Sequence, residues 1–138
     1  MIKVVFFDYG RVLYGPVLPH PKVRRLAREL RANGLKTGII SNTFLTVPWI
    51  LHLLGGYRGF EPVVLSSKEK IAKPDPKIYQ IAIERGGVKP EEVLFIDNLQ
   101  ENIAAAQKMG MKTVLAKNSD QIVNDTKKVL LQENNLEL

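Results

Sequence analysis

The stretch IKVVFFDYG, residues 2–10, decides the fold class of this chain. Its middle is an unbroken apolar run, rich in β-branched and aromatic residues, that ends at Phe7. Such a run is typical of a strand buried on both faces, and Asp8 and Gly10 end it as turn residues do. We therefore predict a buried strand over residues 2–7, with the carboxyl group of Asp8 directly after it.

The rest of the chain repeats this arrangement, because short apolar runs alternate with segments of helical periodicity. Further strands are predicted over residues 36–41, 63–66, 93–96 and 112–116. Helices are predicted over residues 21–33, 46–54, 76–85, 100–109 and 119–131, with Thr46 and Ser119 as N-caps. Continuously apolar strands that alternate with helices indicate a parallel sheet with both faces covered. The predicted fold class is therefore α/β, a doubly wound parallel sheet of five strands with helices on both faces.

Length and composition fit one domain over residues 1–138, with a polar tail over residues 132–138. Hydrophobic residues make up 45% and charged residues 25%, the balance of an ordinary soluble protein. No apolar run reaches the roughly 20 residues of a membrane helix, so no membrane partner is expected. Cysteine is absent, which excludes disulfides and thiolate metal sites and makes a cytoplasmic location the expectation.

The net charge of +6 favours acidic partners such as phosphorylated ligands or nucleic acid. The densest basic group places Arg24, Arg28 and Arg31 on one face of a predicted helix, opposite its apolar face. No aromatic residues interleave with these arginines, as a base-stacking surface would require. We therefore expect a solvated helix face there, and nucleic acid is the less favoured partner.

Polar residues lie at the edge where parallel α/β sheets bind ligands, beyond the carboxyl ends of the strands. They are Asp8 after the first strand, Ser41 and Asn42 at the second, Lys73 after the third, and Asp97 and Asn98 after the fourth. Each alone is ordinary, since an Asp at a strand end is commonly a turn former. Together, two carboxylates can bind Mg²⁺, while Lys73 and Ser41 can neutralise and hold phosphoryl oxygens. The set predicts a phosphate-transfer site in which Asp8 can serve as a covalent nucleophile.

Four segments, in this order, resemble the sequence motifs of the haloacid dehalogenase superfamily. They are FFDYGRVL at 6–13, GIISNT at 38–43, AKPDPKIY at 72–79, and LFIDN at 94–98 with Asn102 beyond it. AAA at 104–106 and MGM at 109–111 are similar to a subgroup with dehalogenases, sugar-phosphate phosphatases and the phosphatase half of epoxide hydrolase. The resemblance covers residues 2–116 and implies the same Rossmann-like fold.

The resemblance also implies roles for the residues at the strand ends. Asp8 would be the nucleophile, with Lys73 beside it in catalysis. The phosphate-binding residues would be Ser41, Asn42 and Lys73. The ligands of a Mg²⁺ cofactor would be Asp8, the carbonyl of Gly10, Asp97 and Asn98. The implied activity is that of a phosphatase that forms an aspartyl phosphate on Asp8.

At Gly10 the chain departs from the motif, because phosphatases of the family commonly carry a second Asp two residues after the nucleophile. Gly10 has no side chain, and Arg11 is a poor proton donor or acceptor. General acid–base assistance is typically worth about 10²–10⁴-fold, so turnover of unactivated esters is expected to be slow. His20, Tyr9 and Tyr14 are the alternative proton donors, although such residues on a loop are more often structural.

Two further departures concern the metal and the substrate. Asn98 stands where many relatives carry Asp, so weaker Mg²⁺ binding is expected. Relatives in the subgroup usually insert a helical cap between the first two motifs, whereas only residues 14–35 intervene here. An open site fits a large phosphorylated substrate or a covering partner subunit. Residues 47–54, with Trp49, are a candidate homo-oligomer interface, but packing onto the sheet is the preferred interpretation.

We interpret the chain as a capless Mg²⁺-dependent phosphatase. A 2-haloacid dehalogenase is less favoured, because that chemistry needs a cap-lined apolar pocket. Two alternatives stay open. A catalytically weak, phosphate-binding regulatory protein is favoured by Gly10, Asn98 and the missing cap. A nucleic-acid end phosphatase is suggested by the charge and the open site.

Overall fold

A five-stranded parallel sheet forms the centre of the protein, which a computed structural model describes over residues 1–14, 20–43 and 55–138. The strands are β1 (Val4–Phe7), β2 (Lys36–Ser41), β3 (Val63–Leu65), β4 (Val93–Asp97) and β5 (Lys112–Leu115). Their order in the sheet is β3-β2-β1-β4-β5, and every neighbouring pair is parallel. The predicted doubly wound sheet is confirmed, and β1 lies at its centre.

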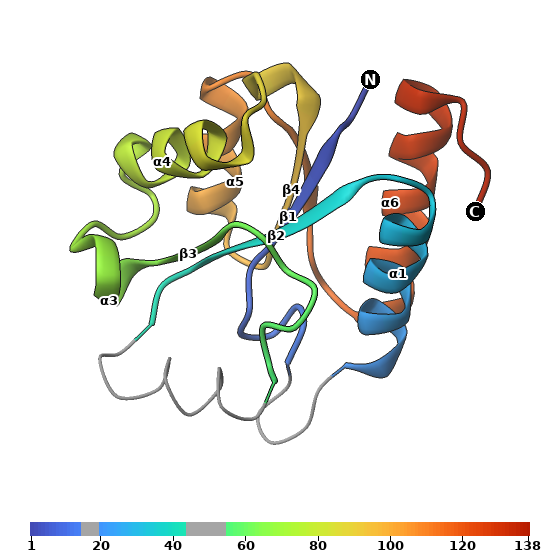
Figure 1. Cartoon of the computed structure of the whole chain (residues 1–138), viewed down its shortest axis with the longest axis horizontal. Helices are drawn as coiled ribbons and strands as arrows, with labels where there is room; N and C mark the ends of the chain where they lie inside the picture. The colour runs from blue at the N-terminus through green and yellow to red at the C-terminus, as the bar shows by residue number, and fades with distance from the viewer. Residues whose placement is uncertain (15–19, 44–54) are drawn as a thin grey trace.

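Helices cover both faces of the sheet (Figure 1). The helices α1 (Pro21–Ala32) and α6 (Ser119–Asn134) pack together against one face, and α4 (Pro76–Gly86) and α5 (Gln100–Lys108) against the other. The short helix α3 (Ser66–Glu69) follows β3 directly, and the 3₁₀ helix η1 (Pro90–Glu92) precedes β4. Among the described residues, every helix is too short or too polar to cross a lipid bilayer.

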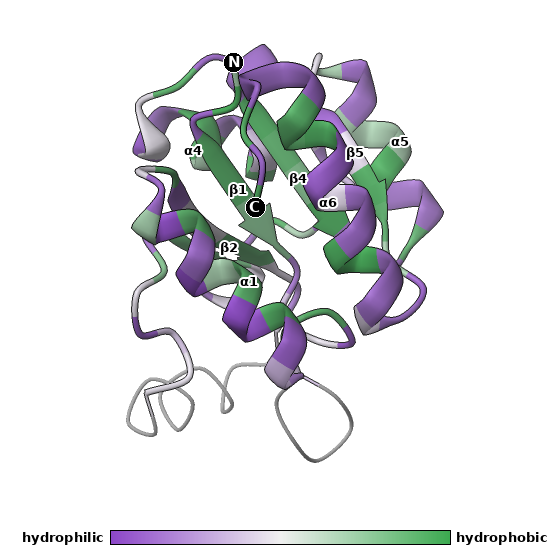
Figure 2. Cartoon of the chain, turned by 90° about the vertical axis from the view of Figure 1, so that its right-hand side faces the viewer, coloured by the Kyte–Doolittle hydropathy of each residue, from purple (hydrophilic) through white to green (hydrophobic). Residues whose placement is uncertain are grey.

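The side chains of β1 divide the core between the two faces of the sheet. Val5 and Phe7 pack into the cluster beneath α1 and α6, whereas Val4 and Phe6 pack into the cluster beneath α4 and α5. All four are fully buried, which explains why the strand is an unbroken apolar run in the sequence. Figure 2 shows hydrophobic strands inside and hydrophilic residues on the outer sides of the helices.

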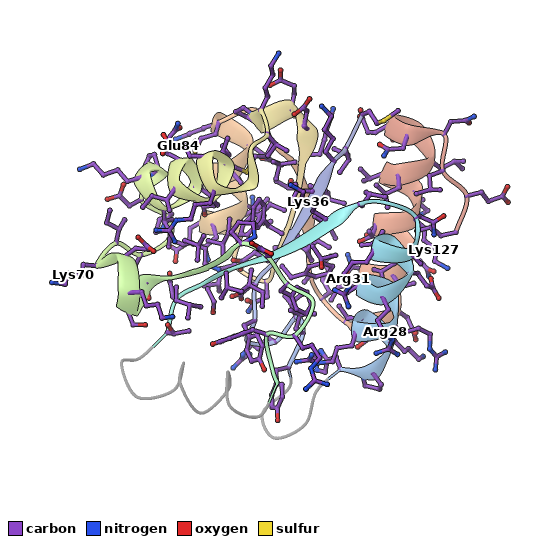
Figure 3. All side chains as sticks on the ribbon, in the orientation of Figure 1. Arg28, Arg31, Lys36, Lys70, Glu84 and Lys127 are labelled. Atoms are coloured by element: carbon purple, nitrogen blue, oxygen red, sulfur yellow. The ribbon has the colours of Figure 1, made fainter. Side chains whose placement is uncertain are left out.

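The basic face of α1 is only partly solvated. Arg28 is exposed and extends from the outer side of the helix (Figure 3). Arg31 instead donates from Nη1 to Thr37 Oγ1 at 2.7 Å and lies 5.1 Å from the centre of the Phe60 ring. Arg24 packs on tyrosine rings. The expectation of a solvated face is therefore wrong for Arg24 and Arg31, because guanidinium groups stack on aromatic rings that distant segments bring to them.

The ends of several elements differ from the prediction. β1 begins at Val4 rather than at residue 2, and Ser66 belongs to α3 rather than to β3. Asn118, not Ser119, is the N-cap of α6, because its side chain accepts a hydrogen bond from the first turn of that helix. The helix predicted over residues 46–54 lies outside the described residues.

The chain continues as a helix where the sequence predicts a polar tail. α6 extends to Asn134, whose side-chain amide accepts from the Ile2 N–H at 2.7 Å and donates to the Ile2 carbonyl at 2.8 Å. Leu136 and Leu138 pack against the core beneath α1 and α6. Residues 132–134, predicted as the start of a polar tail, therefore belong to α6, and Asn134 is held by its contact with the start of the chain.

Candidate active site

The carboxyl ends of β2, β1 and β4 are adjacent in the sheet, so the residues at these ends share one edge. Asp8 follows β1, and its backbone N–H donates to the Ile96 carbonyl of β4 at 2.9 Å. Ser41 and Asp97 are the last residues of β2 and β4, and both are buried. The structure thus places a carboxyl group at the end of each of two neighbouring strands, with a serine beside them.

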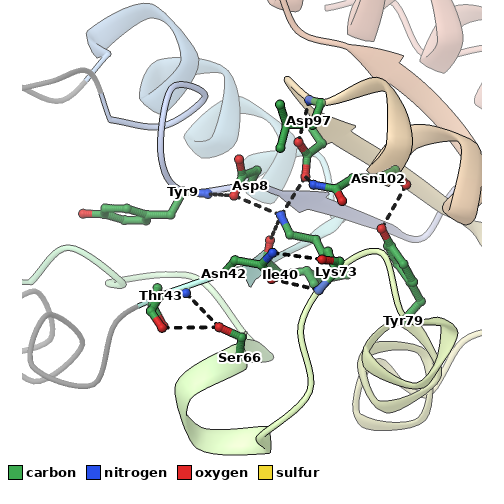
Figure 4. Close-up of polar contacts among 11 residues, drawn as sticks. Asp8, Tyr9, Ile40, Asn42, Thr43, Ser66, Lys73, Tyr79, Asp97 and Asn102 are labelled. Carbon is green, nitrogen blue, oxygen red and sulfur yellow. Dashed lines mark hydrogen bonds and ion pairs between the residues drawn. The ribbon is translucent and has the colours of Figure 1, made fainter.

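Lys73 lies between the two carboxyl groups (Figure 4). Its side chain is 1% exposed, and its Nζ donates to Asp8 Oδ1 at 3.0 Å, to Asp97 Oδ2 at 2.6 Å and to the Ile40 carbonyl at 2.8 Å. An ammonium group has three N–H donors, so the protein satisfies all of them. A buried charge is tolerated when it is paired and fully hydrogen-bonded. Lys73 therefore joins Asp8 and Asp97 into one charged unit.

Asn42 holds the backbone of Lys73. Its Nδ2 donates to the Lys73 carbonyl at 3.0 Å, and its Oδ1 accepts from the Lys73 N–H at 2.8 Å. This two-point contact ties the end of β2 to the segment that leads into α4. The side-chain amide of Asn42 is therefore engaged with protein backbone, which sequence reasoning did not anticipate.

A second set of contacts fixes the end of β2 against α3 (Figure 4). The Thr43 N–H donates to Ser66 Oγ at 2.9 Å, and Ser66 Oγ donates to the Thr43 carbonyl at 3.3 Å. The hydroxyl oxygens of Thr43 and Ser67 are 3.0 Å apart. These bonds hold the chain in a defined direction as it leaves Ser41.

Asp97 is fully buried and accepts hydrogen bonds on both oxygens. Its Oδ1 accepts from the Leu99 N–H at 2.9 Å, and its Oδ2 accepts from Asn102 Nδ2 at 3.1 Å as well as from Lys73. The Asn102 carbonyl accepts from the Tyr79 hydroxyl at 2.9 Å, and the buried Asn102 Oδ1 has no partner within residues 1–14, 20–43 and 55–138. Asn102 is part of the fourth sequence motif, but the sequence alone assigns it no role. Its position in the first turn of α5, which follows Asp97, is the signal that could have placed it here.

Asp8 is less buried, with 13% of its side chain exposed. Its Oδ1 accepts from the Tyr9 N–H at 2.9 Å and from Lys73. Burial raises the pKa of Asp8 to about 6, against the opposing effect of Lys73, and the nearby Asp97 charge raises it further. Near neutral pH Asp8 is thus an ionised carboxylate with little solvation.

The oxygen atoms at this edge fit a Mg²⁺ ion. Asp8 and Asp97 supply two carboxylates, and Mg²⁺ usually takes one or two, with water as its other ligands. The unpartnered Asn102 Oδ1 is a further oxygen beside Asp97. The exposed Gly10 and the half-buried Asn98 lie on the loops that follow the two carboxylates. Within the described ranges, His, Cys, Asp and Glu side chains form no group of three or more suited to a metal, so carbonyl, amide or water oxygens would complete the site.

The alternative proton donors are held by other contacts. His20 Nδ1 lies 2.9 Å from the Val12 carbonyl, so this nitrogen is engaged with backbone. Tyr9 is buried and stacks on Tyr14 with 5.5 Å between ring centres. Burial also raises the pKa of Tyr9 above its ordinary value, which makes its hydroxyl a poorer acid.

Comparisons with known proteins agree with this geometry. A sequence model described as haloacid dehalogenase-like hydrolase matches residues 2–110. Glyceraldehyde 3-phosphate phosphatase from Methanopyrus kandleri is 38% identical over 116 residues, which cover 83% of this chain and 50% of that protein. The chain spans about half the length of the curated phosphatases of this name from three archaea.

Solved structures show the same fold. An uncharacterized protein from Corynebacterium glutamicum has a TM-score of 0.79 at 22% identity, over 94% of this chain and 95% of that chain. A HAD family enzyme from Bacteroides thetaiotaomicron, solved with magnesium and inorganic phosphate, has a TM-score of 0.63 at 30% identity. That match covers 72% of this chain and 53% of the other.

Proposed function

The chain belongs to the family of haloacid dehalogenase-like hydrolases, and we propose that it is a Mg²⁺-dependent phosphatase with Asp8 as its nucleophile. The observation that carries the proposal is the buried Lys73 ammonium, bonded to both Asp8 and Asp97 at the carboxyl edge of the sheet. The phosphatases among its relatives support phosphate esters as the substrate class.

The charges of the site support the proposed dependence on a divalent cation. Two carboxylates and one ammonium leave an excess of one negative charge, which would repel a phosphate monoester dianion. The ligands of Mg²⁺ in this proposal are Asp8, Asp97, the Gly10 carbonyl and the Asn98 side-chain oxygen. When bound, the ion neutralises the phosphoryl oxygens and makes the phosphorus more electrophilic. Ser41 would bind the remaining phosphoryl oxygens, and the Lys73 ammonium would neutralise part of their charge, with Asn42 orienting Lys73.

The hydrogen bonds of Asp8 assign its two oxygens different roles. Oδ1 accepts from Tyr9 and Lys73, so we assign the attack to Oδ2. In the first step Oδ2 forms a bond to phosphorus, the ester P–O bond breaks, and the leaving oxygen takes a proton from solvent. In the second step water attacks the phosphorus of the aspartyl phosphate and loses a proton to solvent, and the bond between Asp8 Oδ2 and phosphorus breaks. Inorganic phosphate leaves, and the Asp8 carboxylate is restored.

The segment between β1 and β2 bears on the size of the substrate. Within residues 8–14 and 20–35 it contains one helix, α1, which packs against the sheet. We therefore propose that the bulk of a phosphorylated substrate extends beyond the site, where either the substrate itself or a partner subunit covers it. A phosphate-binding regulatory protein with little turnover is the second candidate, and Gly10 favours it because it offers no acid for the leaving group.

The test is phosphate release from an aryl phosphate, sugar phosphates, nucleotides and phosphopeptides, with Mg²⁺ or with EDTA. Asp8→Asn should remove the Mg²⁺-dependent release, because Asn is nearly isosteric but a poor nucleophile. Asp120→Asn is the matched control, since Asp120 is an exposed residue of α6 with 71% of its side chain accessible. Wild-type turnover in Asp8→Asn would show that the nucleophile is wrong. Phosphate binding without release from any substrate would favour the regulatory candidate.

A further inference from the structure

Three tyrosines pack together on the side of Asp8 that faces α1. Tyr9 stacks on Tyr14, with 5.5 Å between ring centres and 15° between planes, and Tyr57 meets the Tyr9 ring edge-on at 5.3 Å. Tyr9 is 6% and Tyr57 is 8% exposed. Because these two rings are buried, they offer no face on which a substrate could stack.

Arg24, in the first turn of α1, closes this group, which we call the tyrosine cluster. Its guanidinium carbon lies 5.9 Å from the centre of the Tyr9 ring and 6.0 Å from that of Tyr14. Its Nη2 donates to Tyr9 Oη at 3.3 Å and to the Gly56 carbonyl at 3.4 Å. One guanidinium group therefore joins α1, the turn after β1 and the segment before β3.

Among the residues that the structure describes, Arg24 Nε and the Tyr57 hydroxyl of the tyrosine cluster are buried and have no hydrogen-bond partner. Burial raises the pKa of Tyr57 to about 12, which agrees with a hydroxyl that nothing solvates. Buried polar atoms without partners are uncommon because they lose their hydration, and they call for a reason other than packing.

Tyr9 connects the tyrosine cluster to the nucleophile. Its backbone N–H donates to Asp8 Oδ1 at 2.9 Å, while its carbonyl accepts from the N–H groups of Leu13 at 3.1 Å and Tyr14 at 3.0 Å. The turn that follows Asp8 is therefore closed around the Tyr9 peptide. A shift of the Tyr9 side chain would move the N–H group that, together with Lys73, fixes Oδ1.

We propose that Arg24 is a positioning residue for Asp8, which acts through Tyr9 to hold the carboxylate with Oδ2 directed at the phosphorus. This inference rests on the proposed phosphatase function. It also assigns Tyr9 a positioning role, because its hydroxyl oxygen accepts a hydrogen bond from Arg24.

The test compares Arg24→Met, Arg24→Lys and Tyr9→Phe with wild type, using an aryl phosphate and Mg²⁺. Arg24→Met removes the charge and the donors and keeps much of the length. Arg25→Met is the matched control, since Arg25 is the exposed neighbour on the same helix. We expect kcat of Arg24→Met to fall on the order of 10-fold to 100-fold, the effect of a slightly misplaced reacting group. The inhibition constant of inorganic phosphate should stay unchanged, because Arg24 contacts none of the proposed phosphate ligands.

Four results are expected if Arg24 acts on Asp8 through Tyr9. Arg24→Lys should recover only part of kcat, because one ammonium cannot span Tyr9 Oη and the Gly56 carbonyl as the planar guanidinium does. Tyr9→Phe should reduce kcat less than Arg24→Met, and the double variant should be no worse than Arg24→Met alone, since both act on one contact. Arg25→Met should keep wild-type kcat.

Contrary results are equally specific. A larger inhibition constant for inorganic phosphate with unchanged kcat would show that Arg24 is a substrate ligand, and it would overturn the inference. A lower melting temperature with unchanged kcat would reduce Arg24 to a structural residue. If Asp8→Asn is inactive while Arg24→Met is fully active, this inference fails and the phosphatase proposal stands. An inactive wild type would overturn both.

Discussion

Burial of Asp8 opposes folding at neutral pH. The pKa of this carboxyl rises from its ordinary value of 3.8 to about 6, with burial as the largest cause. A raised pKa in the folded state means that the folded chain holds the proton more tightly than the unfolded chain does. The folded state is therefore relatively most stable below the unfolded pKa, and this contribution is lost as the pH rises through the folded pKa.

Asp8→Asn should accordingly be more stable than wild type at about pH 8, because the neutral amide avoids the desolvated charge. The gain should be on the order of 1–3 kcal/mol and should shrink towards zero near pH 4. Urea unfolding across a pH series without divalent cations measures it, with Asp120→Asn as the control. A variant that is less stable than wild type at every pH would show that the attraction of Lys73 outweighs burial.

Gly10 leaves room for the acid that relatives carry. A Cβ atom placed there would meet nothing within 4 Å, and the backbone of Gly10 is not in the left-handed region. Gly10→Asp should therefore fold normally and raise turnover of alkyl phosphates about 10-fold or more, with a smaller gain for aryl phosphates, whose leaving groups need no proton. Gly10→Asn controls for the added bulk. Equal turnover of alkyl and aryl phosphates by the wild type would mean that another residue already supplies the proton.

The packing between β1 and β2 depends on Gly38, where no space is left for a side chain. A Cβ atom at Gly38 would lie 2.5 Å from a ring carbon of Phe6 and 2.8 Å from the Pro62 carbonyl oxygen. Gly38→Ala should destabilise the protein by about 1–3 kcal/mol, because the strand or the ring must move. Chemical unfolding measures the loss, and Gly10→Ala, in open space, is the matched control. Equal stability of the two variants would show that β2 shifts freely.

The sequence predicts the elements well because local patterns determine them. An apolar run with a turn residue after it marks β1, and helical periodicity marks α1, α4 and α5, each within a few residues of its true ends. The predicted end of α6 is too early, because the helix continues to Asn134, which bonds to Ile2, 132 positions away in the chain. The prediction that Ser66 belongs to β3 is wrong for a different reason, since a serine after a strand fits the end of a strand and the start of a helix equally well.

The residues of the site also divide into those that the sequence pattern predicts and those that depend on contacts between distant segments. Asp8, Ser41 and Asp97 are predictable because parallel strands bring their carboxyl ends to one edge. The clamp of Asn42 on the Lys73 backbone joins residues 31 positions apart, and no local pattern encodes it. The prediction that Arg24 is solvated is wrong. Its spacing along the helix matches a solvated face, but its partners are tyrosines from other segments of the chain.

The site gathers the ends of several strands, so a ligand bound there should stabilise the whole molecule. Mg²⁺ at about 100 times its dissociation constant should add about 2.7 kcal/mol to the free energy of unfolding. Inorganic phosphate should add stability only when Mg²⁺ is present, because the site alone has an excess of negative charge. Thermal unfolding with Mg²⁺, with phosphate and with both measures this at constant ionic strength. Asp8→Asn should lose most of the Mg²⁺ shift, and a full shift in that variant would place the ion elsewhere.

The burial of Lys73 also makes it a chemical reporter. An acylating reagent reaches surface amines such as those of Lys3 and Lys22, whose side chains are 59% and 61% exposed. The Lys73 nitrogen, bonded to three oxygens and 1% exposed, is shielded from the same reagent. Acylation at Lys73 therefore requires the strand ends to separate, so its rate, read by mass spectrometry against the fast surface amines, measures how often this edge of the sheet opens.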